Sequence, residues 1–134
     1  EKYATLGGTC LNVGCIPSKA LLDSTEHYHN AAHTFAGHGI DLDNLRVDMG
    51  RMIDRKTDVV KANTDGIQFL MKKNKITVHQ GVGSFVDATH VKVTKADGAE
   101  EVFETKHVII ATGSKPTVLP FIQQDKERII TSTE

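Results

Sequence analysis

Two cysteines, Cys10 and Cys15, lie in the run Gly-Gly-Thr-Cys-Leu-Asn-Val-Gly-Cys-Ile-Pro-Ser-Lys at residues 7–19, and the chain has no other cysteine. A disulfide between them would close a loop of about six residues and restrict the unfolded chain by only about 2 kcal/mol, against nearly 5 kcal/mol for a loop of about 100 residues. Such a disulfide would be a poor structural brace. The spacing therefore favours reversible thiol–disulfide exchange.

The residues around Cys15 favour a reactive thiolate. Pro17 suits the first turn of a helix, where its missing N–H costs nothing, so a helix is expected to begin close to Cys15. The unpaired N–H groups and the dipole at such a helix start stabilise negative charge. Lys19, one turn into the helix, would add its cation. Cys10, on the preceding loop, would be free to meet an incoming dithiol or disulfide substrate.

Glycines surround the two cysteines. They would allow the backbone to approach a flat ligand closely, and they are Gly7, Gly8 and Gly14. The alternative interpretation is a buried, inert cysteine pair on a capped helix. For any single residue of the run this alternative is the better one, whereas the complete set of residues favours redox chemistry.

Two long helices are expected to hold this run in place. Apolar residues recur with helical spacing at Leu21, Leu22, Tyr28, Ala32, Phe35 and Ala36, and Gly37 and Gly39 end the pattern. Residues 40–47 should form a loop. A second helix is predicted from its N-cap, Asp48, to about Asn74. Its apolar face comprises Met49, Met52, Ile53, Val59, Val60, Ile67, Leu70 and Met71.

The second half of the chain has the composition of β-strands. Short strands are predicted at Ile76–Val78, Val91–Val93 and Val102–Phe103, with a hairpin turn at Asp97-Gly98. The run His107–Ala111 is apolar without alternation, as in a strand that is buried on both faces of a parallel sheet. Ligands of such sheets gather beyond the carboxyl ends of the strands, where Thr112–Ser114 would lie. The expected fold class is therefore α/β.

Length and composition limit the function classes. The 134 residues are enough for one domain, and 39% hydrophobic and 25% charged residues are ordinary for a globular protein. With a formal net charge of -1, the chain lacks the excess positive charge that binds nucleic acid or acidic membranes, so neither is an expected partner. No apolar run reaches the roughly 18 residues of a spanning helix. Because the first residue is not methionine, we expect an internal piece of a longer protein.

Four of the seven histidines cluster on the first predicted helix and its end: His27, His29, His33 and His38. Thiolate and imidazole are both zinc ligands, so a metal site shared with Cys10 and Cys15 has to be considered. No Cys-X-X-Cys pattern, and no His-X-X-X-His pattern with a carboxylate, supports such a site. We interpret the histidines as solvated helix residues and predict no metal site.

The run Gly7–Leu22 resembles the redox-active disulfide motif of the flavin disulfide reductases. Leu11, Ile16 and Ser18–Leu22 are most similar to the dihydrolipoyl dehydrogenases, the E3 components of 2-oxo acid dehydrogenase complexes. The likeness extends over the whole chain, to Ala-Thr-Gly-Ser at 111–114. It implies that residues 1–134 are a partial FAD-binding, Rossmann-like domain, with two long helices and a small β-meander, that lacks the first βαβ unit.

The resemblance also implies a role for each matching residue. Cys10 would exchange with dihydrolipoamide, Cys15 would face the flavin, and Lys19 would sit near the reactive edge of the flavin ring. The other cofactor-binding residues are implied to be Glu1 at the adenosine ribose, Gly8 and Thr9 along the flavin and pyrophosphate, Gly83 at the adenine, and Thr112, Gly113 and Ser114 at the border of the cofactor.

Several parts of such an enzyme are not found in these residues. The Gly-X-Gly-X-X-Gly turn that binds the FAD pyrophosphate is absent, and Gly81-Val82-Gly83 is a poor substitute because strand-like residues follow it. Also absent are the NAD-binding domain and the dimerisation domain, whose His–Glu pair serves the disulfide of the partner as acid–base.

The resemblance implies a parent homodimer that uses FAD and NAD and receives dihydrolipoamide from the lipoyl domain of the E2 component. Its compartment would be the bacterial cytoplasm or the mitochondrial matrix. Two alternatives stand beside this interpretation. The chain could derive from a related glutathione or mercuric reductase, or it could be a catalytically silent structural module that associates through exposed apolar surface.

Overall fold

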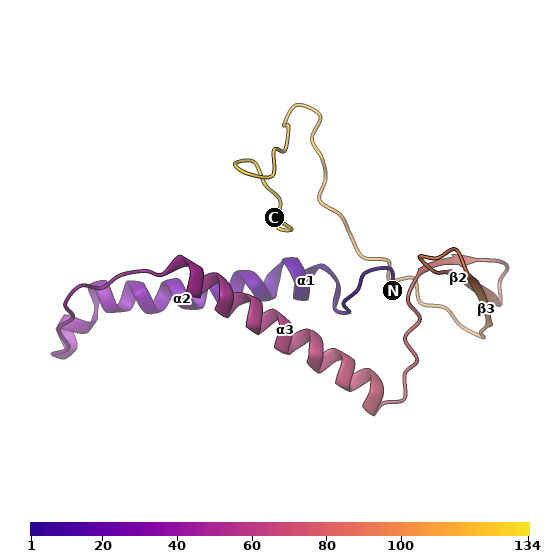
Figure 1. The fold of residues 1–134 in the computed structure, drawn as a ribbon, viewed down its shortest axis with the longest axis horizontal. Helices are drawn as coiled ribbons and strands as arrows, with labels where there is room; N and C mark the ends of the chain where they lie inside the picture. The colour runs from indigo at the N-terminus through magenta and orange to yellow at the C-terminus, as the bar shows by residue number, and fades with distance from the viewer.

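The computed structural model describes residues 1–134 and consists of a helical half followed by a small sheet. The helical elements are α1 (Gly8–Val13), α2 (Cys15–His33), the 3-10 helix η1 (Phe35–His38) and α3 (Met49–Lys73). Figure 1 shows an elongated molecule, with the helices toward one end, the sheet at the other, and the residues after the sheet tracing a long loop away from both. None of the helices has the length and apolarity to cross a membrane.

The two long helices confirm the prediction from sequence. α3 begins after Asp48, whose Oδ1 accepts the Arg51 N–H at 3.1 Å, and it ends at Lys73 with Asn74 as C-cap. α2 ends at His33, somewhat earlier than its apolar pattern, because the chain tightens into η1 before Gly39 turns it at a φ of 75°. Residues 40–47 form the expected loop.

The helical core is thin. Only four of the 134 residues are buried, and three of them come one each from α1, α2 and α3: Leu11, Ala20 and Thr64. α2 and α3 cross as the main helical contact, and α1 touches both. The position of the cysteine run therefore depends on a few close contacts.

The sheet is an antiparallel meander of β1 (Val82–Phe85), β2 (His90–Thr94) and β3 (Glu100–Glu104), in the order β1-β2-β3. Val93 of β2 is the fourth buried residue, and it pairs with Gly83 on one side and Glu101 on the other. The predicted hairpin turn is confirmed, since Gly98 has a φ of 85° and its N–H donates to the Lys95 carbonyl at 3.0 Å. The α/β class and the small meander are therefore confirmed.

Two strand predictions are wrong for this structure. Ile76–Val78 and His107–Ala111 are extended but belong to no sheet, and Ile109 and Ile110 are 91% and 71% exposed. An unalternating apolar strand is stable only when other elements cover both of its faces. None of the 134 residues covers this segment, so its pattern is not realised as a buried strand.

Candidate functional site

Cys10 and Cys15 lie on two successive helices. Cys15 is the first residue of α2, as predicted, whereas the prediction that Cys10 lies on a loop is wrong, because α1 forms within the run. Both side chains are exposed free thiols. Each is therefore open to a substrate or cofactor from solvent.

Gly14 joins the two helices at close range. A Cβ at Gly14 would lie 3.0 Å from the Thr9 carbonyl oxygen and 3.3 Å from the Cys10 Cα. Real Cβ atoms rarely come so close, so only glycine fits between the end of α1 and the start of α2 without displacement. This contact holds the two cysteine-bearing segments against each other.

The three glycines of the run differ in what they do. Gly7 has a φ of 102°, and a Cβ there would meet Leu11 Cδ1 at 2.7 Å, so Gly7, like Gly14, serves packing within the chain. Close contacts within the chain therefore require glycine at these two positions. Gly8 has a φ of 62°, and a Cβ added there would meet nothing within 4 Å, so its backbone is open to an incoming group.

The neighbouring thiol of Cys15 affects the pKa of Cys10. A side-chain hydrogen bond with Cys15 raises the pKa of Cys10 above its ordinary value, and desolvation and the neighbouring charge of Cys15 add to the increase. Cys10 therefore holds its proton more firmly than an isolated thiol. The two sulfur atoms behave as a pair rather than as independent groups.

The start of α2 is open on the side of Cys15. Gly14 is the N-cap and provides no side-chain capping bond, and the first backbone bond into the helix is from the Ser18 N–H to the Gly14 carbonyl at 3.1 Å. Pro17 has no N–H to offer. Lys19 lies one turn from Cys15, is exposed and makes no ion pair. A helix start with a nearby free cation attracts negative charge.

Asn12 positions the cysteine run, a role that sequence reasoning missed. Its Nδ2 donates to the Leu6 carbonyl at 3.1 Å and to the Gly8 carbonyl at 2.9 Å, and its Oδ1 accepts from the Thr5 hydroxyl at 2.7 Å. These bonds connect the residues that precede α1 to the helix itself. An amide between two cysteines is the only sequence signal for this role.

Arg55 fastens α3 to α2, which was also missed. Its Nη1 donates to the Ala20 carbonyl at 2.9 Å and to the Ser24 hydroxyl at 3.2 Å, while Nη2 lies 2.5 Å from Asp23 Oδ2. The bond partners span the second and third turns of α2. Their sequence separation of 31 to 35 residues explains why no local pattern indicates them.

Glu1 and Gly83 lie at the sheet end of the molecule. The amine of Glu1 donates to the His79 carbonyl at 2.8 Å, and the Gly81 N–H donates to the Glu1 carbonyl at 2.9 Å. Gly83, in β1, follows two residues after Gly81, so the two residues for which adenosine contacts are expected lie at the same end of the molecule. The Glu1 carboxylate accepts the Tyr3 N–H at 2.9 Å. Gly81-Val82-Gly83 leads into a strand, whereas a phosphate-binding glycine loop leads into a helix.

Thr112, Gly113 and Ser114 are not brought to the cysteines. All three are exposed in the loop after the sheet, and no hydrogen bond connects them to α1 or α2. Their expected place at the cofactor border depends on the strand at 107–111, which is not formed. Gly8 and Thr9, in contrast, lie in the first turn of α1 beside Cys10.

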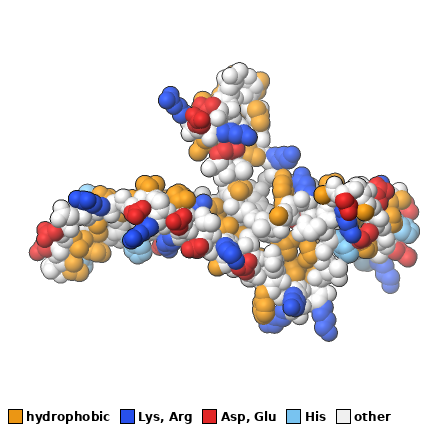
Figure 2. All heavy atoms as spheres, in the orientation of Figure 1, with side chains coloured by type: hydrophobic (Ala, Val, Ile, Leu, Met, Phe, Trp, Pro, Cys, Tyr) orange, Lys and Arg blue, Asp and Glu red, His pale blue; other side chains and the backbone are white.

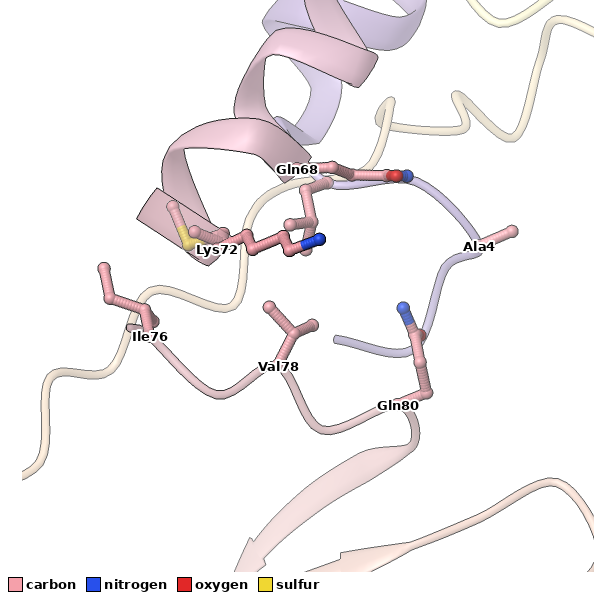
Figure 3. Close-up of a pocket in the computed structure, with 8 residues that line it drawn as sticks. Ala4, Gln68, Lys72, Ile76, Val78 and Gln80 are labelled. Atoms are coloured by element: carbon pink, nitrogen blue, oxygen red, sulfur yellow. The ribbon is translucent and has the colours of Figure 1, made fainter. Parts of the chain in front are cut away.

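The cavity shown in Figure 3 is lined by neither cysteine. Its volume is about 440 Å³, and it is lined by Ala4, Leu6, Gln68, Met71, Lys72, Ile76, Val78 and Gln80. These residues come from the chain before α1, the end of α3 and the segment before β1. Since neither cysteine and none of the expected cofactor-binding residues lines it, this cavity is not the redox site.

Comparison with known proteins agrees with the geometry of the cysteine run. Residues 2–134 match the family model described as pyridine nucleotide-disulphide oxidoreductase. The mitochondrial dihydrolipoyl dehydrogenase 1 of Arabidopsis thaliana is 49% identical over 133 residues, which are 99% of this chain and 26% of that protein. Leghemoglobin reductase of Vigna unguiculata is 50% identical over 133 residues, again 99% of this chain and 25% of that protein.

The solved structure of LpdA from Mycobacterium tuberculosis superposes with a TM-score of 0.84 and 26% sequence identity, over 95% of this chain and 28% of that chain. The chain therefore spans about a quarter of the length of the relatives that it matches. The resemblance noted in the cysteine run extends over almost the full length of the chain, with about half of the residues identical in the two plant proteins. Because the family model matches almost its full length, the chain belongs to the pyridine nucleotide-disulphide oxidoreductase family.

Proposed function

We propose that this chain carries the redox-active disulfide of a dihydrolipoyl dehydrogenase, an enzyme that oxidises dihydrolipoamide and passes the electrons through FAD to NAD⁺. The observation that carries the proposal is the placement of Cys10 in α1 and Cys15 at the start of α2, joined by Gly14 in close contact with Thr9 and Cys10. Relatives with that name, at 47 to 49% identity over almost the whole chain, support it.

The exchange step needs two sulfur atoms with different tasks. A thiolate of dihydrolipoamide attacks the Cys10 sulfur, the Cys10–Cys15 bond breaks, and Cys15 leaves as a thiolate. The second substrate thiol loses its proton and attacks the first substrate sulfur, so lipoamide closes its disulfide and Cys10 is released. Two electrons have then moved to the cysteine pair. Of the two substrate protons, one ends on Cys10 and the other leaves to solvent or to a base.

The pKa of Cys10 suits the task of proton holder. Because the hydrogen bond with Cys15 raises that pKa, Cys10 takes up a proton readily when it is released. Cys15 is the first residue of α2, where unpaired N–H groups and the helix dipole attract negative charge. The assignment of Cys10 to the substrate and Cys15 to the cofactor follows from this asymmetry.

The residues around the thiols fit a flavin. Cys15 is exposed at an open helix start, Lys19 is a free cation one turn away, and Gly8 leaves room beside the first turn of α1. Glu1 and Gly83 would hold the adenosine end, with Thr9 and Thr112–Ser114 along the cofactor. When bound there, FAD supplies the acceptor for the two electrons of the dithiol.

The wider setting is proposed from the same relatives. The whole enzyme would be a homodimer within a 2-oxo acid dehydrogenase complex and would receive dihydrolipoamide from the lipoyl domain of the E2 component. Several similar dihydrolipoyl dehydrogenases are named as mitochondrial, which favours the mitochondrial matrix over the alternative, the cytoplasm of a bacterium.

A second candidate concerns the 134 residues by themselves: a structural module without catalytic turnover. The observation in its favour is the exposed segment 107–111 and a core of four buried residues. We expect the purified chain to bind FAD weakly and to oxidise dihydrolipoamide negligibly in the presence of NAD⁺. Full turnover would contradict this second candidate and leave the first one in place.

Trapping of mixed disulfides tests the assignment of the thiols. A lipoamide analogue activated as a mixed disulfide is offered to the reduced Cys15→Ser and Cys10→Ser variants, and the adducts are read by intact mass and peptide mapping. We expect an adduct at Cys10 in Cys15→Ser that forms much faster than the adduct at Cys15 in Cys10→Ser. Faster labelling of Cys15 would contradict the proposed roles.

Flavin spectroscopy tests the same assignment from the side of the cofactor. The chain is reduced and excess FAD is added. A thiolate that lies against the flavin should then produce a long-wavelength absorption band. The band should survive Cys10→Ser and disappear in Cys15→Ser. The reverse pattern would contradict the roles.

A further inference from the structure

His29 and His33 form a pair on the surface of α2. They are separated by one helical turn, both are exposed, and their ring centroids lie 4.7 Å apart with an angle of 50° between the ring planes. Side chains four residues apart on a helix lie one above the other on the same face. The two imidazoles are thus already gathered in one place.

The pair lies on the side of α2 that α3 leaves free. α3 holds α2 through the Arg55 contacts to Ala20, Asp23 and Ser24. At about 100° per residue, His29 and His33 lie about 180° and 220° around the helix from Ala20. Within this chain they are therefore open to a ligand from solvent.

We propose that His29 and His33 together chelate a divalent transition-metal cation through one ring nitrogen each. Two imidazoles at positions i and i+4 of a helix are a known way to hold one metal ion. Of the common divalent cations, Cu²⁺ binds imidazole nitrogen most strongly, followed by Ni²⁺ and Zn²⁺. Water fills the remaining coordination positions.

The proposal departs from the prediction of no metal site for this pair alone. That prediction concerned a site with several protein ligands, and no group of three or more histidine, cysteine or acidic side chains in the chain could hold a metal ion. A site with two donors is open and exchangeable, unlike a structural zinc site with four. The thiols of Cys10 and Cys15 are not part of it.

The other histidines with close neighbours are engaged differently. His27 lies 3.8 Å from Asp23, His90 Nδ1 is 2.8 Å from Asp87 Oδ1, and the ring of His79 packs on Phe103. No other pair of histidine rings in the chain lies as close together. His27, on the same helix and equally exposed to solvent, is therefore a matched control.

Cu²⁺ binding tests the proposal. Both cysteines are first alkylated, so that thiols neither bind nor reduce the metal, and Cu²⁺ is then titrated while binding is followed by calorimetry and electron paramagnetic resonance. We expect one preferred site with two nitrogen donors. His29→Gln and His33→Gln should each weaken it at least about tenfold, because loss of one donor removes the chelate effect. His27→Gln should leave it unchanged.

Thermal unfolding gives a second measurement, because it reports the effect of bound Cu²⁺ on the stability of the fold. A cation that bridges one turn of the folded helix stabilises the folded state, so Cu²⁺ should raise the Tm of the parent chain and of His27→Gln but not of His33→Gln. Circular dichroism without metal checks that each variant keeps its helices. Equal Cu²⁺ affinities of all three variants, or a weakening by His27→Gln as large as by His33→Gln, would overturn the proposal.

Discussion

The helices around the cysteine pair and the loop after the sheet carry similar apolar residues, but only the helices bury some of them. Leu11 and Ala20 are buried in α1 and α2, whereas Ile109 and Phe121 are 91% and 78% exposed. Figure 2 shows hydrophobic side chains at the surface of both regions. The comparison teaches that the thiol pair is arranged by residues close to it, while the expected cofactor border at 112–114 requires strands from elsewhere.

The largest expected difference between the two regions is in the rate of backbone amide hydrogen exchange. No backbone N–H from residues 108–118 donates to another backbone group, whereas the interior of α3 is fully bonded. We expect exchange near the intrinsic rate for the loop and protection by at least about 100-fold within α3. Strong protection of 107–111 would show that this segment pairs with another chain and would break the comparison.

What could be predicted from the sequence follows the same division. The bounds of α3 and the start of α2 were predictable because Asp48, Asn74 and Pro17 act on their own turns. The Arg55 bridge was not, since its partners lie over 30 residues away. The prediction of a strand at 107–111 was wrong because a continuous apolar segment forms a buried strand only if other elements cover both of its faces. The apolar pattern does not show whether such elements are present.

The candidate site divides in the same way. The pairing of Cys10 with Cys15 was predictable from the motif, and their different environments agree with different tasks. The helix α1 between them was not, because six residues with two flanking glycines give no periodic signal. Its formation depends on the bonds of Asn12 and on the contact of Gly7 with Leu11.

Two glycine substitutions sharpen the comparison within the helical half. Gly14→Ala should destabilise the chain by about 1–3 kcal/mol, because its Cβ would press on Thr9 and Cys10. Gly66→Ala, in α3 with open space around it, should instead stabilise by about 1 kcal/mol. Urea unfolding measures both. Equal effects of the two substitutions would show that the contact at Gly14 is unimportant.

Replacing Arg55 tests how far the position of α2 depends on α3. Arg55→Leu should cost about 1 kcal/mol of unfolding free energy, because it removes the bond to the Ala20 carbonyl together with a half-exposed ion pair to Asp23. Arg51→Leu is the control, since the Arg51 side chain is 89% exposed. A loss no greater than that of the control would mean that Arg55 does not fasten the helices.

The smallest effect is expected at the turn between β1 and β2. Hydrogen bonds from the Thr89 N–H and from His90 lower the pKa of Asp87 from 3.8 to about 2. A lowered pKa means that the carboxylate stabilises the fold above 3.8, and that this contribution is lost as the pH falls through about 2. NMR titration of the carboxyl group should give the low value, and Asp87→Asn should abolish this part of the acid sensitivity. A titration near 3.8 would contradict it.

The most direct test of the central claim, that Cys10 and Cys15 act as one coupled pair, is the pH dependence of Cys10 alkylation in the reduced chain. Because the hydrogen bond with Cys15 raises the pKa of Cys10, its alkylation by iodoacetamide should require a higher pH than that of an ordinary thiol. The Cys15→Ala variant has no thiol that can bond to Cys10, so the pH dependence of Cys10 alkylation should shift to lower pH. An identical profile in the two chains would contradict the account.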